Sequence, residues 1–184
     1  FIAQTVQPAG KILGLKKPTD RKLIEKYDVI YVQFAPSVNP SPGDQYSIIR
    51  AEKKVSRPVK REKMGTLVEV LGEAEVIEST GDHPELWVSR SFEPIHSGDA
   101  FIRKPVKNPV RIDPDKPVGS KNIQGYIVSA KGKIGDLGEE DIVCLDVGTV
   151  NGIALGDHFS VLKGPKRMDK KEKNELQKSP LGEL

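Results

Sequence analysis

Short runs of β-branched and aromatic residues recur along the chain, and their partial alternation with polar residues predicts strands. No stretch sustains a helical period over three turns, so only short helical turns are expected. Glycine and proline, with 17 and 14 copies, separate the runs at intervals of roughly ten residues. This spacing is typical of small barrels and sandwiches. The predicted strands cover residues 29–34, 45–50, 65–71, 73–78, 86–91, 100–102, 125–130, 141–147 and 158–163.

The fold class that follows is mainly all-β, with two related small units that are each barrel-like or sandwich-like. Residues 104–120 contain four prolines and few apolar side chains, which is a linker composition. This segment separates a first β unit at 1–103 from a second β unit at 121–184. Within the first unit, the charged segment 51–63 has almost no apolar anchor, so we predict an exposed loop there.

The two units share a pattern at an offset of 113 residues. The strand that follows Asp28 aligns with the strand that follows Asp141, and residues 43–49 align with 156–162. In the first unit, about 35 further residues follow the stretch 64–67, but none follow its counterpart at 181–184. The second unit is therefore expected to be truncated. Either missing residues or strands exchanged from another chain, as in a strand-exchanged dimer, would complete it.

Three Gly-Asp pairs mark the predicted turns. Glycine adopts positive φ without a Cβ clash, and an aspartate at this position accepts hydrogen bonds from nearby backbone N–H groups. The sequence shows no converging cluster of ligands, so we expect these aspartates to shape turns rather than bind a metal. The pairs are Gly43 with Asp44, Gly98 with Asp99, and Gly156 with Asp157.

Candidates for catalytic chemistry are few. The histidines His83, His96 and His158 lack the spacing of a zinc site. Cys144 lies among apolar strand residues, where packing is a better interpretation than a nucleophilic role. The sequence also lacks a nucleophile elbow and a phosphate-binding loop. We therefore expect no enzymatic activity, no catalytic residue and no cofactor.

Charge and aromatic content offer weak candidates for ligand contact. The formal net charge is +3, and the segment 163–178 alone carries +4. This segment has no interleaved aromatic residues, so a solvated loop is expected rather than a nucleic-acid site. Its Lys166 and Arg167 remain candidate ligand contacts. Trp87 could stack on a sugar, although core packing is the stronger expectation for a lone tryptophan. No apolar stretch is long enough to span a membrane.

Several motifs occur in a fixed order along the chain. They read GKILG at 10–14, YDVIYV at 27–32, PGDQYSI at 42–48, MGTLVEVLGEA at 64–74, SRSFEPI at 89–95 and GTVNGIALGD at 148–157. In this order they resemble the region that follows the LysM domain in bacterial LysM-containing envelope proteins, mostly of Gram-negative bacteria. The resemblance covers most of the chain, and its motifs are structural.

The resemblance implies a periplasmic or cell-envelope location and attachment to peptidoglycan through LysM. The LysM module itself does not appear in this sequence, so no glycan-binding residue is transferred from it. The expected function is a non-catalytic scaffold or spacer that could contact other envelope proteins. The alternative is a β domain that binds glycan or peptide directly, and a cell-wall enzyme is the least favoured hypothesis.

Overall fold

The computed structural model describes residues 1–17, 20–58, 61–80, 83–104, 122–131 and 137–162. The expected linker at 104–120 lies almost wholly outside this range, as do Lys166 and Arg167. The strands are Ile2–Ala3 (β1), Gly10–Leu15 (β2), Val29–Phe34 (β3), Gln45–Ser56 (β4), Lys63–Glu78 (β5), Glu85–Ser91 (β6), Ala100–Arg103 (β7), Ile127–Ala130 (β8) and Val143–Leu145 (β9). A single 3-10 turn, Thr149–Asn151 (η1), is the only helical element in the described ranges.

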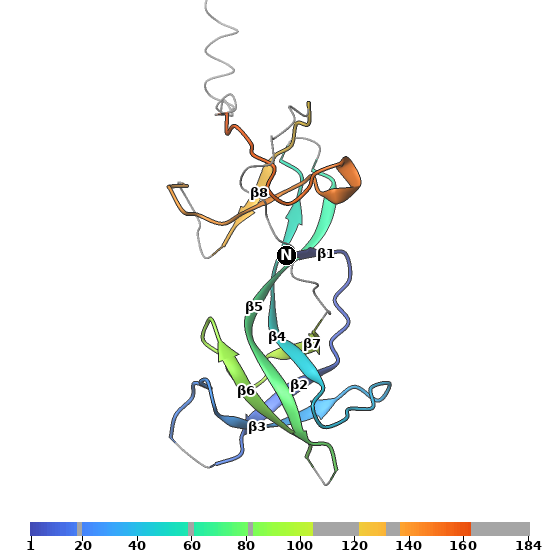
Figure 1. Cartoon of the computed structure of the whole chain (residues 1–184), viewed down its shortest axis with the longest axis vertical. Coiled ribbons are helices and arrows are strands. Elements are labelled where there is room, and N and C mark those ends of the chain that lie inside the picture. The colour runs from blue at the N-terminus through green and yellow to red at the C-terminus, as the bar shows by residue number, and fades with distance from the viewer. Residues whose placement is uncertain (18–19, 59–60, 81–82, 105–121, 132–136, 163–184) are drawn as a thin grey trace, which may run out of the picture.

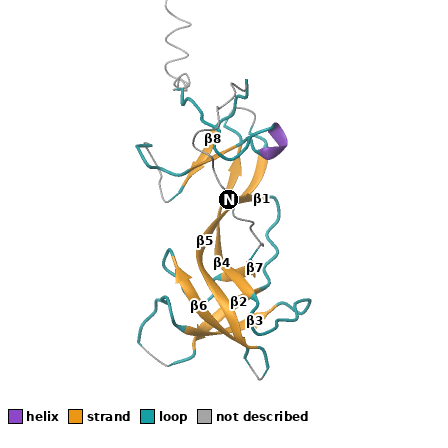
Figure 2. Ribbon diagram, viewed as in Figure 1, coloured by secondary structure: helices purple, strands orange, loops and turns teal. Residues whose placement is uncertain are grey.

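The first seven strands form one antiparallel sheet in the order β1-β5-β4-β7-β2-β3-β6. Because β6 also pairs with β5, six of these strands close into a ring, with β1 added to the outer edge of β5. The strands β8 and β9 make a separate two-stranded sheet. Figure 2 shows strands throughout, with the 3-10 turn beside β8. The prediction of a mainly all-β fold is confirmed.

The core of the first unit fills this ring. Alternate residues of the strands point inward, as Ile30 and Val32 do on β3, where both are fully buried. Three aromatic rings meet in edge-to-face contacts, with centroids 5.1 to 5.5 Å apart. These rings belong to Phe34, Tyr46 and Phe101. The alternation that predicted the strands therefore also selects the buried face.

The strands β4 and β5 continue beyond the ring as a two-stranded ribbon that runs toward β8 (Figure 1). The prediction of a loop at 51–63 is wrong, since β4 extends to Ser56 and β5 begins at Lys63. Backbone pairing with β5 holds these charged residues extended, and Val55 is buried as an apolar anchor. The two strands predicted at 65–71 and 73–78 are likewise one continuous strand.

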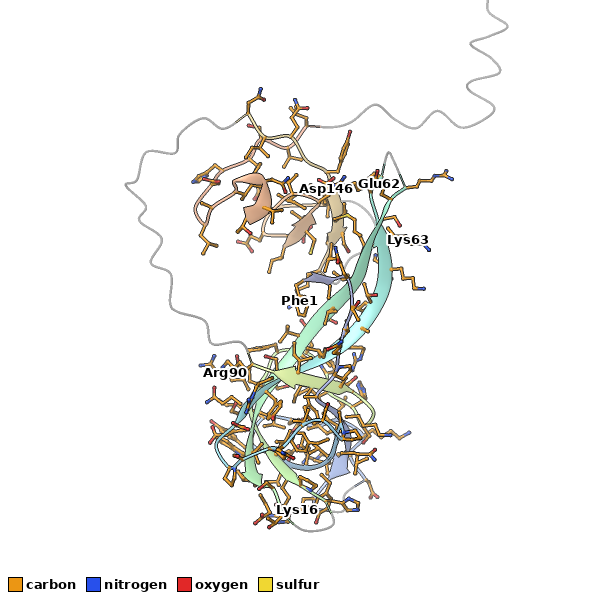
Figure 3. The ribbon with its side chains drawn as sticks, turned by 90° about the vertical axis from the view of Figure 1, so that its right-hand side faces the viewer. Phe1, Lys16, Glu62, Lys63, Arg90 and Asp146 are labelled. Atoms are coloured by element: carbon orange, nitrogen blue, oxygen red, sulfur yellow. The ribbon has the colours of Figure 1, made fainter. Side chains whose placement is uncertain are left out.

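Two ion pairs join the second unit to the first. The Nε atom of Arg57 lies 3.1 Å from an Asp146 carboxylate oxygen, and Lys131 lies 2.8 Å from Glu93. Figure 3 places Asp146 beside Glu62 and Lys63, at the far end of the ribbon from Lys16. The end of the ribbon therefore carries one of these contacts, and the segment after β6 carries the other. Among the described residues, no helix is long and apolar enough to cross a membrane.

Candidate functional site

The three predicted Gly-Asp turns share one geometry. Their glycines have φ values of +89°, +92° and +90° at positions 43, 98 and 156. In each turn the aspartate carboxylate accepts a hydrogen bond from the backbone N–H three residues earlier. These donors are Ser41 at 3.1 Å, His96 at 2.8 Å and Ala154 at 2.8 Å. The carboxylates of Asp44, Asp99 and Asp157 thus act as turn acceptors.

The same turn occurs twice without glycine, which the sequence analysis missed. Asp28 accepts a hydrogen bond from the Glu25 N–H, and Asp141 accepts one from the Gly138 N–H. The residues before these aspartates, Tyr27 and Glu140, have φ values of +76° and +65°. Residues that carry a side chain rarely adopt a positive φ, so the surrounding contacts must hold the backbone in this conformation. The only signal in the sequence was an aspartate at the entry of a strand.

Asp99 also anchors an arginine. Its two carboxylate oxygens accept hydrogen bonds from Arg50, at 2.9 Å from Nε and 2.7 Å from Nη2. Asp99 is buried, and these hydrogen bonds raise the pKa of Arg50. The same Arg50 Nη2 lies 3.0 Å from Nδ1 of His96. Arginine can only donate, so Nδ1 is the acceptor and a neutral His96 carries its proton on Nε2. This cluster links β4 to the turn before β7.

Asp44 makes the stability of its turn sensitive to acid. The Ser41 N–H, and also Arg103, lower the pKa of the Asp44 carboxyl. A carboxyl whose folded pKa is lowered stabilises the protein above its unfolded pKa, about 3.9, and loses this effect as pH falls through the folded value. We expect Asp44→Asn to lower the melting temperature at pH 7 and to make no difference near pH 2. Thermal melts of both proteins across this pH range test it, and a difference that persists in acid would contradict it.

Trp87 does not lie in the core. Its neighbours Leu86 and Val88 occupy the buried positions of β6, so Trp87 points to the outer face and is only partly buried. The prediction of core packing is therefore wrong, because the strand alternation assigns this position to the surface. Trp87 stacks on the exposed ring of Tyr27, with centroids 6.0 Å apart and planes inclined by 20°. The Nζ atom of Lys26 lies over the same Tyr27 ring, 4.5 Å from its centroid.

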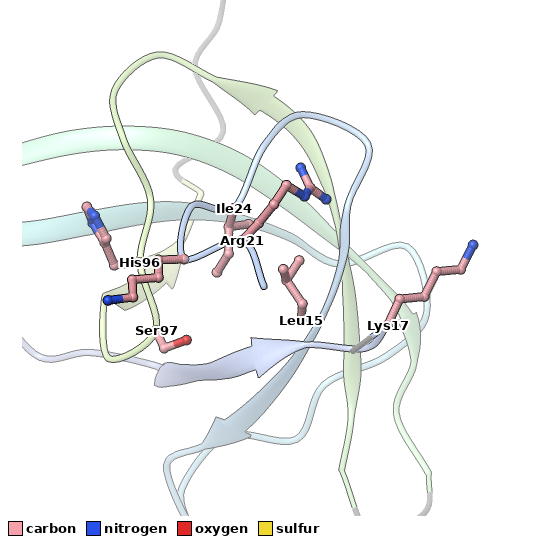
Figure 4. A pocket seen from close by; sticks show the side chains of 7 residues that line it. Leu15, Lys17, Arg21, Ile24, His96 and Ser97 are labelled. Atoms are coloured by element: carbon pink, nitrogen blue, oxygen red, sulfur yellow. The ribbon is translucent and has the colours of Figure 1, made fainter. Parts of the chain in front are cut away.

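A basic pocket of about 430 Å³ lies between the segment after β2 and the turn at His96. Figure 4 shows Leu15, Ile24 and Ser97 directed toward its centre, while Lys17 extends outward. The remaining lining residues are Arg21, Lys22 and His96. Arg21 already pairs with Glu25 and Asp28, at 2.7 and 3.0 Å. The pocket therefore has an apolar centre with basic residues around it, and it lacks an acidic lining residue among the described ones.

A second, more apolar groove of about 600 Å³ lies between the ribbon and the β8–β9 hairpin. Cys144 lines it together with Val70, Phe92 and Ile142. Cys144 is partly buried and not in a disulfide. Within the described ranges, no three His, Cys, Asp or Glu side chains gather as a metal site.

The structure does not bring the candidate residues together into one centre. Trp87 lies on β6, and the turn aspartates belong to separate turns, each of which they stabilise locally. The candidate functional surfaces are thus the Tyr27–Trp87 pair, the basic pocket and the apolar groove. Comparison with protein-family models, with curated proteins and with solved structures finds no match to this chain.

Proposed function

We propose that the chain is a non-catalytic scaffold or spacer of a Gram-negative cell envelope, built from two copies of one β unit. The motif order that resembles the post-LysM region supports the envelope location and attachment to peptidoglycan through a LysM domain outside this sequence. Tandem copies of a structural unit set distances between attachment points without any chemistry. The observation that carries the proposal is the matching strand register of the two units.

In the first unit, β2 pairs with β3 so that Ile12 lies opposite Val32, Gly14 opposite Tyr31, and Leu15 opposite Ile30. In the second unit, β8 pairs with β9 so that Ile127 lies opposite Leu145, Ser129 opposite Cys144, and Ala130 opposite Val143. The β3 and β9 residues of these pairs correspond at the offset of 113, whereas the β2 and β8 residues correspond at an offset of 115, which aligns GKIL at 10–13 with GYIV at 125–128. Each hairpin also has its register shift directly after the first of these pairs. A one-residue slip would invert the faces of a strand, so a shared register and a shared bulge support a common origin.

Hydrogen bonds outside the ladders match as well. The backbone N–H of Lys16 donates to the Val29 carbonyl at 2.9 Å, and the backbone N–H of Lys131 donates to the Ile142 carbonyl at 2.8 Å. In the loop after the first hairpin, the Val38 N–H donates to the Ala35 carbonyl at 2.9 Å. In the loop after the second hairpin, the Asn151 N–H donates to the Gly148 carbonyl at 2.8 Å. The two equivalent Gly-Asp turns then follow. Among the described residues, the agreement runs from the first strand of each hairpin to the Gly-Asp turn, which supports duplication of one folding unit.

Direct glycan binding is the second candidate, and the Tyr27–Trp87 pair favours it. Stacked aromatic faces with one exposed ring suit an apolar sugar face. Tyr27 is 64% exposed, and a sugar that stacks on its ring would displace the Lys26 ammonium that lies over it.

Binding of the isolated chain to purified peptidoglycan separates the two functions. The scaffold proposal expects no retention in a sedimentation assay, because attachment depends on LysM. Direct binding expects retention that Tyr27→Ala abolishes and that Tyr126→Ala, at another exposed tyrosine, leaves unchanged. Retention of that kind would overturn the scaffold proposal in favour of the second. Release of soluble muropeptides from labelled peptidoglycan would overturn its non-catalytic part.

A further inference from the structure

The second unit leaves exposed the positions that are buried in the first. Ile24, Tyr46 and Ile48 are at most 2% exposed in the first unit. Their counterparts Leu137, Phe159 and Val161 are 45%, 42% and 75% exposed. We predicted a strand at 158–163, equivalent to the start of β4, but its described residues 158–162 are in no strand. Within its described residues, the second unit thus has the apolar residues of the fold without strands that cover them.

The first unit shows what covers this hairpin. There, β6 pairs antiparallel with β3, placing Trp87 opposite Val29 and Leu86 opposite Ile30. The Val32 N–H donates to the Pro84 carbonyl at 3.0 Å along this same edge. The other edge of β3 faces β2, where Lys16 donates to the Val29 carbonyl. Alternate residues of β3 therefore direct their backbone groups to β2 and to β6.

Val143 and Leu145 on β9 correspond to Ile30 and Val32 on β3. Their N–H groups therefore point to the edge of the hairpin that β6 covers in the first unit. The Ile142 carbonyl instead accepts from Lys131, on the β8 side. The structure pairs β9 with β8, and the described residues supply no second strand for it. Ile142, at the start of this edge, is 66% exposed.

We propose that the free edge of β9 accepts an extended peptide segment whose apolar residues alternate as they do in β6. The segment pairs antiparallel with residues 142–144, in the register that β6 takes on β3. In this register an apolar side chain at the position of Leu86 lies beside the half-buried Val143, and the Leu145 N–H faces the carbonyl at the position of Pro84. The proposal rests on the duplication put forward above.

The occupant is a separate segment of β6-like pattern rather than β6 of a second copy. In this fold β6 already pairs on both edges, with β3 and with β5. Removing it from a second molecule would open a closed ring and expose Leu86 and Val88, both fully buried. Strand addition to a free edge requires no such opening, and backbone hydrogen bonds together with alternate side-chain contacts supply the affinity.

A synthetic peptide with the sequence of residues 84–91, PELWVSRS, tests the proposal when added to the full chain. Amide hydrogen exchange read by NMR should slow at Val143 and Leu145, by about tenfold when free peptide exceeds its Kd tenfold. The amides of Ile142 and Cys144, which face β8, should change less. A control peptide with lysine at the positions of Leu86 and Val88 should have no effect.

Val143→Pro is the matched variant, because it removes one edge N–H while an edge strand tolerates proline. It should abolish the protection at Leu145 and leave the β8-facing amides as they are in the original chain. The proposal is overturned if saturating amounts of the peptide protect neither Val143 nor Leu145, or if protection survives in Val143→Pro. The readout of this experiment is amide exchange at β9, so a failure to see protection does not change the peptidoglycan sedimentation result. Likewise, the sedimentation result does not change the outcome of the exchange experiment.

Discussion

Replacing Tyr46 by alanine is expected to lower the free energy of unfolding of the first unit by about 3–5 kcal/mol. The Tyr46 ring is fully buried and meets Phe34 and Phe101 at centroid distances of 5.5 and 5.3 Å. Its removal leaves a cavity inside a closed ring of strands, which cannot collapse freely. Urea denaturation followed through Trp87 fluorescence measures this effect, since the single tryptophan lies in the first unit.

Phe159→Ala is the matched control, because Phe159 occupies the equivalent position of the proposed repeat. Its side chain is 42% exposed, so its loss should change the stability by less than about 0.5 kcal/mol. Calorimetry of the full chain would detect an effect in either unit. Equal losses from both substitutions would show that the second unit has a closed core in solution, contrary to the exposure seen here.

Asp99→Ala is expected to lower the free energy of unfolding by about 1.5–3 kcal/mol, the range for hydrogen bonds to charged groups. The buried carboxylate accepts two hydrogen bonds from Arg50 and one from the His96 backbone. The substitution therefore removes the turn acceptor and leaves the arginine without its bidentate partner. Denaturant titration gives the value, and retained secondary structure by circular dichroism confirms that the variant folds.

Asp44→Ala separates the contribution of the turn from that of the arginine. Asp44 shapes an equivalent turn, but it pairs with Arg103, whose side chain is 67% exposed. The loss should therefore be smaller than the loss caused by Asp99→Ala. A double-mutant cycle of Asp99→Ala with Arg50→Ala should give a coupling of about 1–3 kcal/mol. Additive losses would mean that the ion pair contributes nothing beyond the turn.

Several strands and all three Gly-Asp turns could be predicted because they depend on local physics. Glycine at positions 43, 98 and 156 has the positive φ that its missing Cβ permits, and the following aspartate bonds within four residues. The alternation of side chains between the two faces of a strand depends only on the two-residue repeat of the extended backbone. The equivalent turns at Tyr27 and Glu140 were missed, because neither residue favours positive φ by itself.

The errors have a common cause in partners that are distant in the sequence. Residues 51–56 look like a loop by composition, yet pairing with β5 makes them a strand. Trp87 looks like a core residue by type, yet the register of β6 against β3 places Leu86 inside instead. Composition describes a residue alone, whereas burial depends on the face that the neighbouring strand leaves open.

The class of the fold, the positions of most strands and the similar segments at an offset of 113 residues follow from the amino-acid sequence alone. The three-dimensional structure was needed to show that six strands close into a ring and that the β2–β3 and β8–β9 hairpins share register and bulge. It alone also decided that equivalent apolar residues are buried in one unit and exposed in the other. The physical reason is that turns and strand period are set within a few residues, while closure and burial require pairing between segments far apart in the chain.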